Sequence, residues 1–173
     1  LTLKIDENGY APHGQKTVIE GGAKFDRAQV DGAVSWLNLE IRGPAPDGSK
    51  GGVLSLEDAK IGGPLQAKAL TTQAEARIDV SGTSCAALED DLKTGWGVEQ
   101  CPLDLEGFTY ERLDGDSRWR GRLAWLKRGQ IEGKRFSPQP YTTLAQVYAR
   151  AGQREDARRV LLAQHDQRTF LAS

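Results

Sequence analysis

The chain contains 173 residues, of which 38% are hydrophobic and 27% charged, and its formal net charge at pH 7 is −1. This length allows one domain with a sizeable core, and the recurrence of Leu, Val and Ile argues against disorder. No apolar run reaches the roughly 18 residues that a membrane-spanning helix needs. The chain contains no Met, even at position 1, so we expect it to be a piece of a longer protein.

The first part of the chain predicts short strands separated by turns. Residues 1–5 alternate apolar and polar side chains, which predicts a strand. Residues 6–14 have the Asp, Asn, Gly and Pro content of a turn, and a short strand is expected at 17–19, before a Gly-Gly corner.

A repeat of apolar and small residues then organises the chain. Its positions are separated by single polar residues or by a Gly or Asp corner, as in short strands joined by bends. The equivalent residues are Phe25, Ala28, Val30 and Val34; Leu56, Ala59, Ile61 and Leu65; Val80, Thr83, Cys85 and Leu88; and Leu105, Phe108 and Tyr110. Successive copies start 31, 24 and 25 residues apart, which is typical of repeat architectures, and a loop insertion at 43–52 explains the longest interval.

This repeat predicts a mainly β fold over residues 1–114, a right-handed β-solenoid in which stacked coils bury ladders of inward side chains. Each fully buried Leu or Ile would contribute about 1.5–3 kcal/mol. The last copy carries larger residues, and we expect Phe108 and Tyr110 to close the stack. Because Cys85 falls on an inward position, the sequence favours a reduced core thiol over a disulfide with Cys101, and with it a cytoplasmic setting.

Beyond residue 114 the apolar spacing changes from that of strands to that of helices. Residues 115–173 are expected to form a helical C-terminal cap, with a helix at about 117–128 and a helical hairpin at about 138–167. A glycine follows the first helix, and another separates the two helices of the hairpin. The side chains expected to face inward on the hairpin are Leu144, Ala145, Tyr148, Ala151, Ala157, Val160, Leu161 and Gln164.

The charges are unevenly distributed along the chain. From Arg118 onward twelve Lys and Arg residues accompany four acidic residues, a net charge of +8, which leaves −9 on the preceding part. Such a basic end can attract anionic lipid headgroups, or it can dock on the acidic part of the same or another copy. Nucleic acid is not favoured, because this end has little aromatic interleaving and no recognised binding module. The residues expected to bind an anionic surface are Arg118, Arg122, Arg150, Arg154, Arg158 and Arg159.

The C-terminal region resembles a single tetratricopeptide-type helical hairpin, with Leu144, Ala145, Tyr148, Gly152 and Ala157 at the intervals of that repeat. One copy cannot build a peptide-binding superhelix, because such a surface needs several stacked repeats. We therefore expect this hairpin to pack on the end of the β region.

A wider resemblance covers nearly the whole chain. It rests on the Leu-x-Leu-x-x-Ala-x-Ile-Gly-Gly-x-Leu pattern at 54–65, on the segments 88–91 and 103–110, and on Phe136-Ser-Pro-Gln-Pro-Tyr141. These segments resemble bacterial proteins labelled "membrane-associated oxidoreductase", whose members carry a bactofilin-like or pentapeptide-like β-solenoid. The resemblance implies attachment to a membrane and an oxidoreductase activity.

Few residues could carry chemistry. No Gly-x-Gly-x-x-Gly motif leads from a strand into a helix, so the sequence predicts neither a bound dinucleotide nor another cofactor. The two cysteines do not form a Cys-x-x-Cys pair. The two histidines, His13 and His165, are too far apart in the sequence to suggest a metal site or a Ser/His/Asp triad.

Two acidic groups remain as candidate sites. Glu89, Asp90 and Asp91 lie near a tryptophan and could bind a cation or a sugar, but a solvated bend with an aromatic anchor accounts for them as well. Asp104 and Glu106 are expected to face outward from one strand, where they could act as an acid/base pair in a polysaccharide-cleaving solenoid. Pairs of this kind are also common on exposed strand faces.

Two hypotheses on function follow. The sequence favours a non-catalytic scaffold or interaction module that binds itself or another protein, or an anionic membrane surface from the cytoplasmic side. The alternative is an enzyme, either an oxidoreductase, as the label of the similar proteins implies, or a carbohydrate-active protein.

Overall fold

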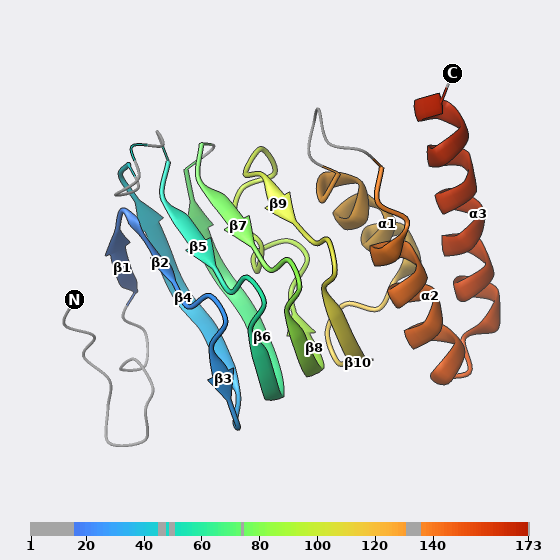
Figure 1. Ribbon diagram of the computed structural model, residues 1–173, viewed down its shortest axis with the longest axis horizontal. Coiled ribbons are helices and arrows are strands. Elements are labelled where there is room, and N and C mark those ends of the chain that lie inside the picture. Colours follow the sequence, from blue (N-terminus) through green and yellow to red (C-terminus); the bar gives the residue numbers. More distant parts are fainter. Residues whose placement is uncertain (1–15, 45–47, 49–50, 74, 131–135, 173) are drawn as a thin grey trace.

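The computed structural model describes residues 16–44, 48, 51–73, 75–130 and 136–172. Within these ranges the chain forms ten strands followed by three helices. The strands stack along the long axis of the molecule, and the helices lie at one end of the stack (Figure 1). The strand predicted at 1–5, the turn at 6–14 and His13 lie outside the described residues, as does half of the loop insertion at 43–52.

All strand pairs in the described ranges are parallel, and they form two sheets. The larger sheet has the order β1-β4-β6-β8-β10, with β3 also beside β6. Its strands are β1 (Thr17–Glu20), β3 (Gln29–Val30), β4 (Val34–Arg42), β6 (Lys60–Thr72), β8 (Ser84–Asp90) and β10 (Thr109–Leu113). The smaller sheet has the order β2-β5-β7-β9 and contains β2 (Gly22–Lys24), β5 (Val53–Ser55), β7 (Arg77–Asp79) and β9 (Leu103–Asp104).

The register of the larger sheet confirms the equivalences that the repeat predicts. Ile61 pairs with Val30 on one side and with Cys85 on the other, and Cys85 pairs with Tyr110. The side chains of Ile61, Cys85 and Tyr110 are buried in the hydrophobic core. Because equivalent apolar residues lie directly beside one another, each strand covers the apolar side chains of its neighbour.

Equivalent corners of successive repeat copies use residues in the left-handed region. Arg27, Asp58, Gly82 and Gly107 have φ angles of 59°, 58°, 65° and 75°, and each lies two residues after the start of a copy. Glycine, and to a lesser extent Asp, adopts this conformation more readily than other residues. This requirement explains the Gly or Asp corner in the sequence pattern.

The predicted fold class is wrong. The sequence predicted a mainly β, right-handed β-solenoid, whereas the described chain is an α/β structure with two separate parallel sheets and three helices. The helices have 10, 12 and 19 residues, so they are a major part of the fold. The repeat pattern specifies which residues pair in parallel register, but it does not specify that the strands form one closed coil.

The three helices follow the last strand. They are α1 (Trp119–Arg128), α2 (Gln139–Arg150) and α3 (Arg154–Ala172). Helix α2 packs against β10 and α3, and α1 also contacts α3. The sequence predicted a helix at about 117–128 and a hairpin at about 138–167; the division into separate domains at residue 114 stays a prediction.

Some side chains predicted to face inward are exposed. Phe25 is 49% exposed, because the first described copy has a neighbouring described strand on one side only. Leu161 is 45% exposed, since it lies on the outermost helix, and Ala151 is also exposed. Leu144 and Tyr148 are buried as predicted, because α2 lies between the sheets and α3.

The left-handed corner gives a test of the fold. Replacing Gly107 with Ala should lower the free energy of unfolding by about 1–2 kcal/mol, because a Cβ is disfavoured at this φ. The matched control is Gly32→Ala, where an added Cβ would meet no atom within 4 Å. Urea unfolding followed by circular dichroism measures both variants. Equal free energies of unfolding for the two variants would contradict the left-handed conformation assigned to Gly107.

Candidate functional site

A buried ion pair joins the sheets to the helices. Arg122 on α1 donates from Nη1 to Oδ2 of Asp90, the last residue of β8, over 2.8 Å, and its Nη2 contacts the other oxygen of this carboxylate. Neither side chain is exposed to solvent. Trp96 Nε1 also donates to Asp90 Oδ2, over 2.6 Å. The buried carboxylate is thus both paired and hydrogen-bonded, as a charge away from water requires.

Further bonds from the arginines of α1 strengthen this attachment. Arg122 Nε donates to the carbonyl oxygen of Asp116 over 2.6 Å. Arg128 Nε donates to the carbonyl oxygen of Cys101 over 3.0 Å, and its Nη2 contacts that of Trp96. Partial burial lowers the pKa of Arg128 from its ordinary value. Arg122 therefore binds α1 to the end of β8, and Arg128 binds it to the loop that follows β8.

Tyrosines surround the ion pair but are poorly placed for proton transfer. The hydroxyl of Tyr148 donates to the carbonyl oxygen of Ser117 over 2.6 Å, and burial raises its pKa to about 12. Burial also raises the pKa of Tyr110, whose buried hydroxyl has no hydrogen-bond partner among the described residues. Since a general acid or base works best with a pKa near the working pH, the raised pKa values do not favour either hydroxyl for proton transfer.

The acidic residues predicted as a cation site do not converge. Asp90 is buried in the pair with Arg122, whereas Glu89 Oε2 accepts a hydrogen bond from Gln66 Nε2 over 2.6 Å. Asp91 is exposed, and its Oδ1 accepts from the backbone nitrogen of Lys93 over 2.8 Å. No group of three or more metal-ligating side chains exists in the part of the chain that the structure describes.

The predicted acid/base pair does not face solvent together. Asp104 is 4% exposed, so its expected outward orientation is wrong, whereas Glu106 is exposed. Asp104 Oδ1 accepts a hydrogen bond from the backbone nitrogen of Glu106 over 3.2 Å. Asp79, its partner in the register, similarly accepts from the backbone nitrogen and the hydroxyl of Ser81. These aspartates stabilise equivalent corners of the chain, a role common for Asp in turns.

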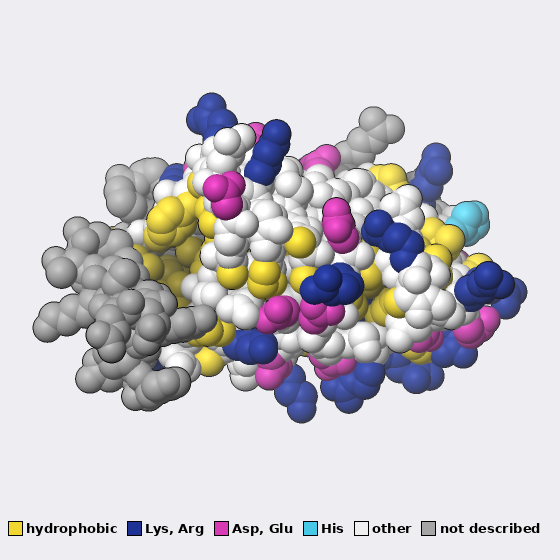
Figure 2. All heavy atoms as spheres, turned by 90° about the horizontal axis from the view of Figure 1, so that it is seen from below, with side chains coloured by type: hydrophobic (Ala, Val, Ile, Leu, Met, Phe, Trp, Pro, Cys, Tyr) yellow, Lys and Arg dark blue, Asp and Glu magenta, His cyan; other side chains and the backbone are white. Residues whose placement is uncertain are grey.

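Most of the predicted anionic-surface residues are exposed on the helical end. Arg118, Arg150, Arg154 and Arg158 are exposed, and Figure 2 shows dark blue side chains gathered where the helices lie. Arg159 is half-buried. Arg122 is the exception, because its guanidinium is enclosed in the ion pair with Asp90, so its predicted role in surface binding is wrong.

Some of these arginines have acidic partners. Arg118 pairs with Asp116 over 2.6 Å, and this contact lowers the pKa of Asp116 to about 2. Arg159 pairs with Glu155 over 3.3 Å, and its guanidinium carbon lies 5.0 Å from the centroid of the Trp119 ring. Within the described ranges, Arg150 and Arg154 make no ion pair, so their charges are available to a ligand or partner.

The outer face of α3 adds a feature that the sequence analysis missed. Leu161 and Leu162 are 45% and 53% exposed. Leu161 shares a helical stripe with Arg154, Arg158 and Arg168, at intervals of three or seven residues, and Leu162 lies beside this stripe, four residues after Arg158. The signal was present in the sequence as a Leu-Leu pair among arginines. The tetratricopeptide-like spacing assigned Leu161 to the inner face instead.

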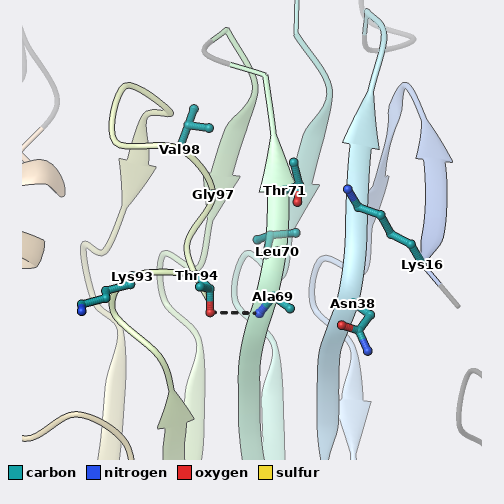
Figure 3. Close-up of a pocket in the computed structure, with 9 residues that line it drawn as sticks. All are labelled: Lys16, Asn38, Ala69, Leu70, Thr71, Lys93, Thr94, Gly97 and Val98. Atoms are coloured by element: carbon teal, nitrogen blue, oxygen red, sulfur yellow. Dashed lines mark hydrogen bonds between the residues drawn. The ribbon is translucent and has the colours of Figure 1, made fainter. Parts of the chain in front are cut away.

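An open groove of about 460 Å³ lies along the larger sheet (Figure 3). Asn38 and Ala69, with φ angles of 52° and 54°, bend β4 and β6 at equivalent points of its wall. Thr94 Oγ1 accepts a hydrogen bond from the backbone nitrogen of Ala69 over 3.3 Å, and Lys16 pairs with Glu40 over 2.7 Å. These polar groups already have partners in the chain, and we assign no ligand to the groove.

Comparison with models of protein families, with curated proteins and with solved structures finds no match for this chain. Within the described ranges, no helix combines the length and the apolar character that crossing a bilayer requires.

The ion pair predicts a large effect of one substitution. Arg122→Ala should lower the free energy of unfolding by about 3–5 kcal/mol, because the Asp90 carboxylate would remain buried without its partner. The control is Lys127→Ala, an exposed position on the same helix, which should change stability by less than about 0.5 kcal/mol. Urea denaturation measures both. A loss below about 1 kcal/mol for Arg122→Ala would contradict a dominant role of the pair.

The cysteines give a second test. Both thiols are free and buried, which confirms the reduced core thiol predicted at Cys85, and burial raises the pKa of Cys85 to about 12 and also that of Cys101. Burial shields both thiols from the reagent and a raised pKa lowers their thiolate fraction, so neither should react with a disulfide reagent in the folded protein. Both should react after unfolding in guanidinium. Rapid reaction of the folded protein would mean that a thiol is accessible.

Proposed function

We propose that this chain is a non-catalytic interaction module that attaches to an anionic membrane surface through its helical end. The observation that carries the proposal is the outer stripe of α3, where Leu161 and Leu162 are exposed between arginines. Exposed apolar residues on a basic helix face can insert at the boundary between headgroups and acyl chains.

The charges support the same proposal. Each Lys or Arg close to an anionic membrane contributes about 1 kcal/mol to binding. Arg150 and Arg154 have no acidic partner within the described ranges, and Arg158 has one only at 4.0 Å, to Glu155. The cytoplasmic leaflet carries the anionic lipids of a cell membrane, so we place the chain at the inner face. The resemblance to proteins labelled membrane-associated points in the same direction.

The enzyme hypothesis has weaker support. It relied on acidic residues, and two of them have structural partners: Asp90 is enclosed by Arg122 and Trp96, and Asp104 bonds the backbone at a corner. No contact of the described residues favours redox chemistry or glycoside cleavage at these positions.

Vesicle binding tests the proposal. The chain should co-sediment with vesicles that contain phosphatidylserine, not with vesicles of phosphatidylcholine alone, and binding should weaken as salt rises. The double variant Arg154→Glu and Arg158→Glu should weaken binding about tenfold or more, because it removes two attractive charges and adds two repulsive ones.

The matched control makes the same change of charge on β6. Lys60→Glu with Lys68→Glu reverses two exposed lysines away from the helices and should bind nearly as the unmodified chain does. Leu161→Ser with Leu162→Ser should reduce binding without altering the net charge. If the unmodified chain ignores anionic vesicles at low salt, or if the control weakens binding as much as the arginine variant, the proposal is wrong.

A further inference from the structure

The end of the molecule opposite the helices is formed by two edge strands. Among the described residues β1 pairs only with β4, and β2 pairs only with β5. The two edges lie at the end where the described chain begins (Figure 1). An edge strand presents backbone donors and acceptors on its outer side, which makes it a template for pairing with another strand.

At the helical end, a side chain provides hydrogen-bond partners for the backbone donors and acceptors of the last repeat copy. Gln139 on α2 accepts a hydrogen bond from the backbone nitrogen of Gly107 over 2.8 Å and donates to the carbonyl oxygen of Phe108 over 3.1 Å. An amide side chain therefore takes the place of a further strand beside the last repeat copy. At the β1 edge, the described part of the chain contains no comparable side chain that bonds the outer backbone of Thr17–Glu20.

The sequence of the β1 edge is complementary to itself. Lys16 and Glu20 lie on either side of Val18, at the spacing that places all three on one face of the strand. If two β1 strands pair antiparallel about Val18, Lys16 of each copy lies opposite Glu20 of the other. Opposite charges directly across an antiparallel pair stabilise it.

The apolar side chains fit the same arrangement. Val18 is 42% exposed, and pairing about this residue would place the two Val18 side chains against each other. Ile19 is buried on the inner face, so the partner's Thr17 would extend the core rather than interrupt it. A two-fold interface of this kind uses the same patch on both subunits and closes after two copies.

We infer that the β1 edge pairs with the β1 edge of a second copy, antiparallel and centred on Val18, so that the chain forms a two-fold dimer with its helical ends pointing apart. The partner is a second copy rather than another protein, because the charge pattern complements itself. The inference rests on the proposed role as an interaction module, but it concerns the opposite end of the molecule. Vesicle binding can therefore fail without affecting it.

Charge reversal tests the pairing. Sedimentation velocity over a wide range of protein concentration should show a monomer–dimer equilibrium for the unmodified chain. Lys16→Glu or Glu20→Lys alone should raise the dissociation constant about tenfold or more, because each places like charges opposite one another twice in the dimer. The double variant should restore dimerisation, because it exchanges the partners of both pairs.

Two controls separate this pairing from other effects. Lys68→Glu makes the same change of charge on β6, away from the edge, and should leave the dissociation constant unchanged. Thermal unfolding checks that Lys16→Glu, which also removes the contact with Glu40, still folds. A chain that stays monomeric at every concentration overturns the inference. A dimer that both single variants leave intact, or that the double variant fails to restore, overturns it too.

Discussion

The buried pair between Arg122 and Asp90 is the contact on which the arrangement of sheets and helices depends. It lies where the larger sheet meets α1, and Trp96 donates to the same carboxylate. A charge in such a place is stable only with its partner, so the orientation of α1 is restricted to the one that brings Arg122 to the end of β8. Helix α1 contacts α3, and the exposed stripe of α3 therefore depends indirectly on this pair.

The two ends of the strand stack differ in whether the backbone groups at the sheet edges have hydrogen-bond partners among the described residues. At the helical end, Gln139 and the arginines of α1 bond backbone groups next to the last repeat copy. At the other end, β1 and β2 are edge strands among the described residues. The same chain thus combines a closed, basic end with an edge whose charges are complementary to themselves. This asymmetry supports an interaction module more strongly than any cluster of residues supports catalysis.

Charge alone was a poor guide to the candidate site. In the sequence, Arg122 and Arg118 are equivalent members of a basic stretch, yet one is enclosed by Asp90 and the other is exposed beside Asp116. Similarly, the sequence predicts that Asp104 and Glu106 face outward from one strand. The buried Asp104 carboxylate instead accepts a hydrogen bond from the backbone nitrogen of Glu106 at a corner of the chain. Spacing gives the face of an isolated element, and only the packing of neighbouring elements decides whether that face reaches water.

The parallel register could be predicted from the sequence, because apolar residues recur at similar offsets and Gly or Asp occupies three of the four equivalent left-handed corners. The sequence also placed the change from strands to helices. The sequence did not predict the two separate sheets beside three substantial helices, the burial of Arg122, or the exposure of Leu161 and Phe25, because these depend on how distant elements pack. Local periodicity records which side chains avoid water, whereas the number of layers that cover them depends on contacts between residues far apart in the chain.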